Sequence, residues 1–437
     1  MKGSINIPPI IIILFGLIIY SVSGLIGMYS SAVNYVKILA VIIVLIAFFK
    51  APKNNRVDNS PRLIQLFAYY TIFIILRGSL LGHLPINMGG EITSVYGVIR
   101  YVLISEFSSI SFLLILCVLI PFDSRELQYY RPLAYICIIM CLVTAWVYKN
   151  ELFSFDTRGT TSIVVNDELL TIRMLIHNCF IGVSFILLYG CCLRVFKKSW
   201  FDYFAMFIVI IYGVAQVAGG GRGGSVTALL YILCLIYFFL KNKTKKIGFF
   251  TKLLRIIIAI LLVYGVFYFL FRTENADFLF SRMFEDGIES GQIRQENRSY
   301  FTDALLAELD SHPWEWIIGK GINGSFFVGG QLRSTIEWGF MYLILKGGLI
   351  YMILYIAVLL RTFFLGFFRS NNVFSKAMAA LCLLCAYSLI PFGLPRVSLD
   401  FVIVWHYVRL VNTNSVRNMT NDEIMVLINS KIKRKKI

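Results

Sequence analysis

The sequence predicts an all-α polytopic integral membrane protein with about 12 transmembrane helices. Three observations lead to this class. Of the 437 residues, 58% are hydrophobic, and the mean hydropathy is +0.76. Apolar runs of the roughly 18 to 20 residues that a bilayer-spanning helix needs recur along the chain. Charged residues gather in the connections between these runs, as they do in membrane proteins.

Taken in chain order, the apolar runs give twelve spans. The first run follows Lys2 and could be a signal peptide, but no A-x-A-like cleavage site separates it convincingly from the second run, so it is the first helix. Polar or charged residues follow most runs and set the approximate helix ends. The predicted spans are 8–28, 32–49, 63–82, 98–121, 132–148, 171–193, 201–218, 225–240, 254–271, 338–360, 376–392 and 398–412.

Alternate connections between the spans differ in their content of basic residues. Because short cytoplasmic connections are enriched in Lys and Arg, this alternation predicts that both termini are cytoplasmic. The connections at 82–95, 149–170, 219–224, 272–337 and 393–397 then face outward. The basic residues of the other set are Lys50, Lys53, Arg56, Arg62, Arg125, Arg131, Arg194, Lys197, Lys198, Lys241, Lys243, Lys245, Lys246, Lys252, Arg361, Arg369, Lys376, Lys431, Lys433, Arg434, Lys435 and Lys436.

Charge, cysteine and histidine content exclude several functions. The net charge of +17 does not indicate nucleic-acid binding, because the basic residues lie between apolar runs. All nine cysteines lie in or beside apolar spans, where a buried thiol is the simpler interpretation, and the four histidines show no metal-ligand spacing. We therefore expect no metal and no cofactor. The cysteines are Cys117, Cys137, Cys141, Cys179, Cys191, Cys192, Cys234, Cys382 and Cys385.

One outward connection is far longer than the rest, and it divides the chain into four parts. These are 1–271 with spans one to nine, the loop at 272–337, 338–412 with spans ten to twelve, and a basic tail at 413–437. The loop contains 11 of the 24 carboxylates. The entropy cost of ordering so much polar backbone must be offset by packing or binding, so the loop is predicted to carry the functional site. The tail either rests on anionic headgroups or is a solvated end.

The first candidate site is the outward turn Gly219–Gly224, where Arg222 stands among five glycines. Glycine permits close backbone approach, so N–H groups near Gly221 and Gly223 and the guanidinium of Arg222 can converge on one anion. Alternatively, the glycines only reverse the chain and Arg222 reaches lipid headgroups.

The second candidate site is the long loop, with Arg282, Arg294 and Arg298 as phosphate ligands, because guanidinium binds phosphate oxygens bidentately. Each could instead pair with a loop carboxylate. Apolar residues at helical spacing predict a helix that lies on the membrane surface with its apolar face down, followed by two interfacial tryptophans. These residues are Phe301, Ala304, Leu305, Leu309, Trp314 and Trp316.

The third candidate is Glu337, which precedes the tenth span. A carboxylate entering an apolar span is costly unless it is paired or used, and desolvation raises its pKa toward that of a useful general base. The alternative is a salt bridge to Lys346 or Arg333; Arg333 is also a candidate substrate-binding residue. Asp303 and Asp310 are reserve candidates for the base.

These features together resemble the O-antigen polymerase and O-antigen ligase superfamily. The resemblance covers the hydropathy profile, the Gly/Arg turn, the loop arginines, the glycine patch at Pro313–Gly321 and the Gly347-Gly348-Leu349 pattern in the next span. It implies a GT-C type fold in the bacterial inner membrane, with the active site facing the periplasm. The implied substrates are undecaprenyl-diphosphate-linked oligosaccharides, and a chain-length regulator is an implied partner.

The resemblance also implies roles for single residues. Arg222 and Arg298 match arginines associated with the donor diphosphate. Glu337 falls where the ligase branch has histidine, which favours the polymerase branch and a metal-independent inverting glycosyl transfer with Glu337 as base. The alternatives are an O-antigen ligase and a flippase for lipid-linked oligosaccharide. Arg77, Arg100 and Arg173, near outward ends of spans, either add to the anion site or anchor helices.

Overall fold

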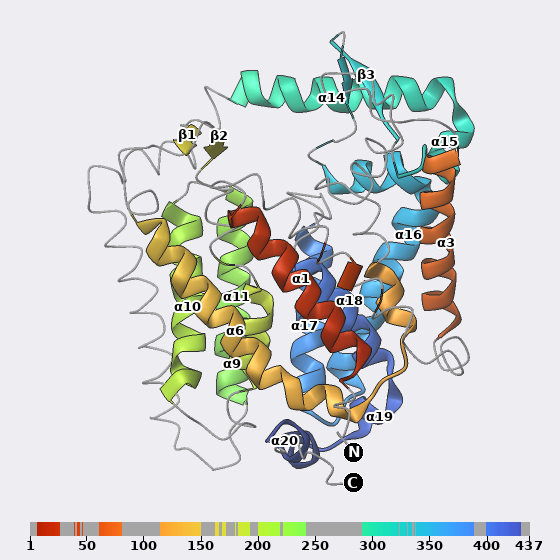
Figure 1. The fold of residues 1–437 in the computed structure, drawn as a ribbon. Coiled ribbons are helices and arrows are strands. Elements are labelled where there is room, and N and C mark those ends of the chain that lie inside the picture. Colours follow the sequence, from red (N-terminus) through yellow and green to blue (C-terminus); the bar gives the residue numbers. More distant parts are fainter. Residues whose placement is uncertain are drawn as a thin grey trace. The chain divides into compact units, whose positions relative to one another are not determined.

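The computed structural model consists mostly of helices, which form two compact units (Figure 1). Unit 1 comprises residues 1–128, 295–419 and 430–437, and unit 2 comprises residues 129–294 and 420–429. The structure describes residues 7–26, 39, 42–43, 46, 61–80, 114–149, 162–165, 168–171, 180, 182–192, 200–218, 222–241, 291–322, 324–329, 331–333, 336, 338–388 and 399–429.

Unit 1 is built from long apolar helices with smaller elements at their ends. Within it, α14 lies across one end of α3 and α16 (Figure 1). Its elements are α1 (Pro9–Ile26), α3 (Arg62–Leu80), the 3₁₀ helices η1 (Leu114–Leu119) and η2 (Ser124–Tyr129), α14 (Gly291–Ser311), α15 (Pro313–Ile318), β3 (Phe326–Val328), β4 (Gln331–Arg333), α16 (Gly339–Phe368), α17 (Val373–Ser388), α18 (Leu399–Asn412) and α19 (Asn414–Asn418). The last residue of η2 and residues 291–294 of α14 belong to unit 2.

Unit 2 is a second group of helices with one hairpin. The strands of this hairpin are antiparallel, and Val165 pairs with Glu168 across its turn. Its elements are α6 (Tyr130–Val147), β1 (Ser162–Val165), β2 (Glu168–Thr171), α9 (Val183–Cys191), α10 (Trp200–Ala218), α11 (Arg222–Lys241) and α20 (Asn421–Asn429).

In the part of the chain that the structure describes, two helical stretches are long and apolar enough to cross a membrane. They are Ser124–Val147, with 24 residues and a hydropathy of 1.6, and Gly339–Phe368, with 30 residues and a hydropathy of 2.3. Shorter apolar stretches lie at Pro9–Ile19, Trp200–Gly213, Thr227–Phe238 and Val373–Ala386. The helical class predicted from the sequence is therefore confirmed, and the number of twelve spans stays a prediction.

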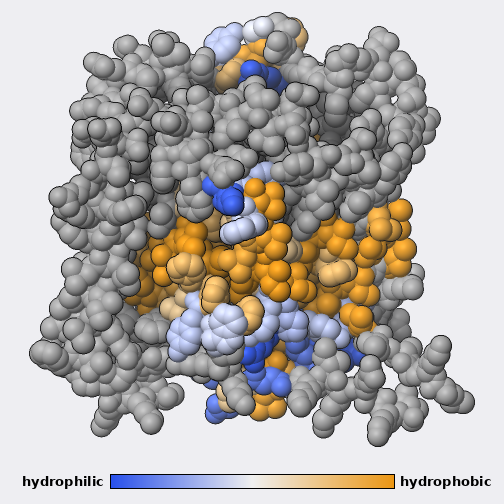
Figure 2. Space-filling model, turned by 60° about the vertical axis from the view of Figure 1, so that its left-hand side comes forward, coloured by the Kyte–Doolittle hydropathy of each residue, from blue (hydrophilic) through white to orange (hydrophobic). Residues whose placement is uncertain are grey.

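Large apolar side chains are exposed along these helices. On the face drawn in Figure 2, hydrophobic residues cover most of the described surface, and hydrophilic residues gather at its lower end. Tyr203 and Phe207 of α10 are more than half exposed, as are Ile353 and Phe364 of α16. Contiguous apolar surface of this kind is unusual on a soluble monomer and typical of a surface that another apolar phase covers.

Three sequence predictions of helix extent need correction. Thr171, predicted to begin a span, lies in β2, and the described helix of that span begins only at Val183, after the left-handed Gly182. The described end of span 98–121 contains the 3₁₀ helix η1 rather than an α-helix. Two hairpins, β1–β2 and β3–β4, lie in loops for which no strand was predicted.

The predicted loop helix exists as α14, but its apolar face packs differently from the expectation. Leu305 and Leu309 are fully buried in unit 1, so these side chains contact protein rather than lipid. Trp314, on α15, is 74% exposed, as expected for an interfacial residue. The location of α14 on a membrane surface stays a prediction. In the tail, α20 buries Ile424 and Ile428, so residues 421–429 are not a solvated coil.

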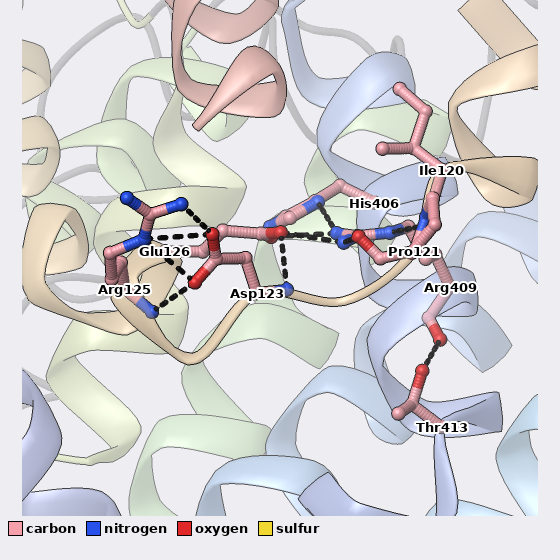
Figure 3. Close-up of polar contacts among 8 residues, drawn as sticks. All are labelled: Ile120, Pro121, Asp123, Arg125, Glu126, His406, Arg409 and Thr413. Carbon is pink, nitrogen blue, oxygen red and sulfur yellow. Dashed lines mark hydrogen bonds and ion pairs between the residues drawn. The ribbon is translucent and has the colours of Figure 1, made fainter. Parts of the chain in front are cut away.

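A buried ion pair attaches α18 to the η1–η2 connection (Figure 3). The Arg409 guanidinium donates to both oxygens of Glu126 at 2.6 Å and also to the carbonyls of Ile120 and Pro121. Both side chains are at most 2% exposed. Because Arg409 is bound on several sides by acceptors of the same unit, this cluster is a structural contact rather than a ligand site.

Nearby lies a second pair that is open to solvent. Arg125 contacts the carboxylate of Asp123, and the two side chains are 48% and 30% exposed. Partial burial raises the pKa of Asp123, but the hydrogen bonds from Arg125 outweigh it, so the net pKa is lowered. At the C-terminal end of α16, burial and the neighbouring charges of Arg361 and Arg369 lower the pKa of Arg417. These arginines therefore gather at the end that was predicted to be cytoplasmic.

Unit 2 also contains a buried carboxylate with several partners. Asp202 of α10 is 1% exposed and accepts hydrogen bonds from Tyr189 and, at 3.2 Å, from Tyr135. Arg131 of α6 lies 3.8 Å from the same oxygen. A buried charge inside a helical bundle is stable only with such partners, and these connect α6, α9 and α10.

Replacing Arg409 by Met should destabilise the protein by about 3–5 kcal/mol, because Glu126 would be left buried without its cation. Thermal unfolding of the full chain in detergent measures this loss. The matched control is Arg125→Gln in the exposed pair, which should cost at most about 1 kcal/mol. Equal losses for the two variants would contradict the assigned structural role of the buried pair.

Candidate functional site

The candidate site is a junction at which the end of the long loop meets two helices of unit 1. Its centre is a segment that we call the junction loop, consisting of Gly319, Lys320, Gly321, Ile322 and Gly324. This segment begins where α15 ends. The N–H of Gly319 donates to the carbonyl of Glu315 at 2.9 Å, and positive φ angles of 69° and 88° at Gly319 and Gly321 turn the chain away from the helix axis.

The junction loop packs against a break in α16. At Gly348 the backbone leaves helical geometry, with φ 69° and ψ −174°. Such a break leaves carbonyls of the preceding turn without their intrahelical donors. The junction loop supplies two replacements, because the N–H of Lys320 donates to Leu345 at 2.8 Å and the N–H of Gly321 to Lys346 at 2.9 Å.

The last turns of α3 complete the junction. The N–H of Ile322 donates to the carbonyl of Ile74 at 3.1 Å, and the hydroxyl of Tyr70 donates to the carbonyl of Gly347 at 3.0 Å. Backbones approach so closely that a Cβ on Gly321 would lie 2.5 Å from the N of Gly78. Glycine is therefore required here by space as well as by φ.

Two cationic side chains hold carbonyls of the junction loop. The Nε of Arg77, in the last turn of α3, donates to the Gly319 carbonyl at 2.9 Å. The Nζ of Lys346, which is 3% exposed, donates to the Gly324 carbonyl at 2.8 Å. A basic side chain of α3 thus holds one end of the junction loop, and a basic side chain of α16 holds the other.

A third cation, Lys320, is paired with carboxylates of α14 and α15. Its Nζ contacts the Glu308 carboxylate and lies 3.4 Å from Oε2 of Glu315. The other oxygen of Glu308 accepts from the N–H of Phe327 at 2.9 Å, which links α14 to β3. Oε2 of Glu315 is buried and accepts no hydrogen bond from the described residues. The ion pair with Lys320 is the interaction described for this oxygen.

The arrangement is rigid and cationic. Three cations and two carboxylates surround the junction loop, and both carboxylates are directed to Lys320. Arg77 binds a neutral carbonyl, and Lys346 binds a neutral carbonyl and lies 5.4 Å from the centre of the Tyr342 ring. Fixed cations at the end of an apolar helix can stabilise an anion or a negative charge that develops during a reaction.

The predicted site residues differ in how far the structure describes them. Arg333 lies on β4, with its guanidinium 4.1 Å from the centre of the Phe301 ring. Arg294 and Arg298 lie on α14, and Arg222 and Gly223 are the first two residues of α11. Gly221, Arg282 and Glu337 lie outside the described residues, as do Arg100 and Arg173.

The predicted diphosphate clamp joins residues from different units. Arg222 belongs to unit 2 and Arg298 to unit 1, so their convergence stays a prediction. The reserve bases are both exposed, and Asp310 accepts a hydrogen bond from the indole of Trp316 at 3.0 Å. Lys346, one alternative partner for Glu337, bonds to the Gly324 carbonyl, and Arg333, the other, stacks on Phe301.

Sequence reasoning identified both glycine patches but not that they bind each other. Gly319 and Gly321 were assigned to the long loop, and Gly347 and Gly348 to the tenth span. Their pairing depends on tertiary contact, which no local pattern encodes. A signal was available in Lys346, because a lysine beside two glycines inside an apolar run indicates a break with a polar partner.

Comparison with known proteins adds no assignment. No family model, no curated protein and no solved structure matches this chain.

Replacement of Gly348 or Gly319 by Ala should destabilise the junction, because the new Cβ would lie 2.1 Å from the Ile317 oxygen or 2.5 Å from the N of Gly347. Unfavourable φ contributes roughly 1–2 kcal/mol, and the overpacking adds about 1–3 kcal/mol. Thermal unfolding in detergent measures the sum.

The matched control for these variants is Gly329→Ala. Its φ is also positive, at 56°, but the nearest side-chain atom, the Tyr300 hydroxyl, is 3.7 Å from the new Cβ. This variant should therefore lose only the part of the stability that is due to unfavourable φ. If all three variants unfold at the same temperature, close packing at the junction is not important for stability.

Proposed function

We propose that this protein is a polysaccharide polymerase that joins undecaprenyl-diphosphate-linked repeat units at the outer face of a bacterial cytoplasmic membrane. The junction is the observation that carries the proposal. Two sequence patches carry the resemblance to the O-antigen polymerase superfamily, Pro313–Gly321 and Gly347–Leu349. The first patch donates backbone hydrogen bonds to Leu345 and Lys346, directly before the second, and Gly319 packs closely against Gly347. The exposed apolar helices support a membrane location. The cytoplasmic position of both termini rests on the basic residues in alternate connections.

The proposed reaction is an inverting glycosyl transfer of the GT-C type. The donor is a growing chain on a polyprenyl diphosphate, and the acceptor is a sugar hydroxyl of an incoming repeat unit. The acceptor oxygen forms a bond to the anomeric carbon of the donor, and the bond from that carbon to the diphosphate oxygen breaks. The hydroxyl proton passes to Glu337, and the polyprenyl diphosphate leaves with the electron pair.

In this proposal Arg222 and Arg298 stabilise the departing diphosphate, since guanidinium groups offset negative charge as it develops. Arg282, Arg294 and Arg333 bind the rest of the substrate. The junction supports this chemistry, because the first turns of α16, which begins at Gly339, are bonded to the junction loop at Leu345 and Lys346. Glu337 lies two residues before α16 in the sequence.

Deletion of the gene should leave surface lipid capped by a single repeat unit, because units would still be made and exported but not joined. Gel electrophoresis of surface polysaccharide measures chain length. Long polymer retained on the prenyl carrier would indicate a ligase instead, and repeat units trapped inside the cell would indicate a flippase. Either result would contradict the polymerase proposal.

Point variants test the residue roles in the purified protein with lipid-linked repeat units. Glu337→Gln should lower the polymerisation rate by about 10²–10⁴-fold if the carboxylate is the base. Arg222→Ala and Arg298→Ala should each lower it by about 10²–10³-fold. The control is Arg361→Ala at the predicted cytoplasmic end, which should polymerise normally. Unchanged chain assembly in the first three variants, at normal protein abundance, would remove the site assignment.

A further inference from the structure

Arg77 is held in an unusual way at the junction. It lies in the last turn of α3, and its Nε donates to the Gly319 carbonyl. A guanidinium has five N–H donors, and this bond uses one of them. The four donors on Nη1 and Nη2 have no partner among the described residues, and no described carboxylate lies within ion-pair distance of Arg77.

This geometry differs from that of a buried structural arginine. Arg409 uses its Nε and both Nη groups on acceptors of its own unit. Arg77 is only partly buried, and among the described residues its two Nη groups, the fork that binds phosphate or carboxylate bidentately, have no acceptor. The bond to Gly319 fixes the plane of that fork, so little side-chain entropy is lost when an anion binds.

An exposed apolar stripe on α3 leads to the same guanidinium. Leu66, Tyr69, Phe73 and Leu76 are between 41% and 54% exposed. Their spacing of three, four and three residues places them on one helix face, and Arg77 continues that face. A ligand that matches this surface has a long hydrocarbon chain ending in an anion.

Prenyl diphosphates and phospholipids both carry a phosphate on hydrocarbon chains. The position of Arg77 favours the prenyl diphosphate, because its Nε is bound to the first residue of the junction loop, in the patch that carries the resemblance. A diphosphate also carries more negative charge than the single phosphate of a phospholipid headgroup. We therefore expect the bidentate contact of a guanidinium to be stronger with the diphosphate.

We propose that Arg77 binds the diphosphate of the polyprenyl-linked substrate through its two Nη groups, while the α3 stripe contacts the prenyl chain. This inference deepens the proposed function and rests on its substrate class. It adds a substrate-binding residue from α3 to a site otherwise assigned to the Gly219–Gly224 turn, the long loop and Glu337.

The test measures binding to the full chain in nanodiscs, using undecaprenyl diphosphate as the probe and undecaprenyl monophosphate for comparison. Arg77→Gln keeps one donor for the Gly319 carbonyl but removes the charge. It should weaken binding of the diphosphate by about 10- to 100-fold, the range expected for charge-assisted hydrogen bonds. Arg77→Lys should retain part of the affinity. Arg62→Gln, at the other end of the same helix, is the matched control and should bind normally.

Several outcomes would overturn the inference. One is normal binding by Arg77→Gln, which would mean that Arg77 only supports Gly319. Another is an absence of diphosphate binding by the unmodified protein. A third is a loss of diphosphate binding by Arg77→Gln that appears in phosphatidylglycerol nanodiscs but not in phosphatidylcholine nanodiscs. Arg77 would then be a headgroup anchor.

The same measurements separate this inference from the polymerase proposal. If the unmodified protein binds undecaprenyl diphosphate through Arg77 but joins no repeat units, the binding site stands and the polymerase proposal fails. If it polymerises normally with Arg77→Gln and also binds normally, the inference fails and the polymerase proposal stands. Thermal unfolding of each variant is measured in the same nanodiscs. If Arg77→Gln loses diphosphate binding only because it misfolds, its unfolding temperature should fall and Arg77→Lys should lose binding as well.

Discussion

The interruption of α16 at Gly348 is the constraint on which the rest of unit 1 depends. A buried carbonyl without a donor costs about as much as a lost hydrogen bond, and no water replaces it inside an apolar layer. The carbonyls of Leu345 and Lys346 find their donors in Lys320 and Gly321, about 25 residues earlier in the chain. The end of the long loop and the broken helix must therefore form together, and α3 joins them through Ile74.

The two charged clusters of unit 1 differ in whether their basic side chains are paired with carboxylates. Arg409 and Glu126 are almost fully buried and satisfy each other, which stabilises one position of α18 and leaves no donor for a ligand. Among the described residues of the junction, carboxylates pair with Lys320, whereas Arg77 and Lys346 bind carbonyls. A carbonyl orients a cation without neutralising it, so the junction retains positive charge that an anion can use.

Elements that depend on local composition were predictable from the sequence. Long apolar runs gave the approximate positions of α3, α10 and α18. Features that depend on contacts between distant segments were not. Leu305 and Leu309 have the spacing of a membrane-surface helix, yet they are buried by protein. For Arg77, anchoring of its helix was preferred over anion binding, because sequence cannot show that Gly319 lies beside it.

A lipid-linked diphosphate imposes two demands that the same few residues of α3 can meet. Its chain needs apolar surface that stays open to the bilayer, and its phosphates need cations where the apolar layer ends. The exposed face of α3 ends at a guanidinium whose plane is fixed by the Gly319 carbonyl. That carbonyl is itself fixed, because the residues that follow it are bonded to α16 and α3. Backbone satisfaction at one broken helix thus preorganises a cation for binding, which is how a structural requirement can become a functional site.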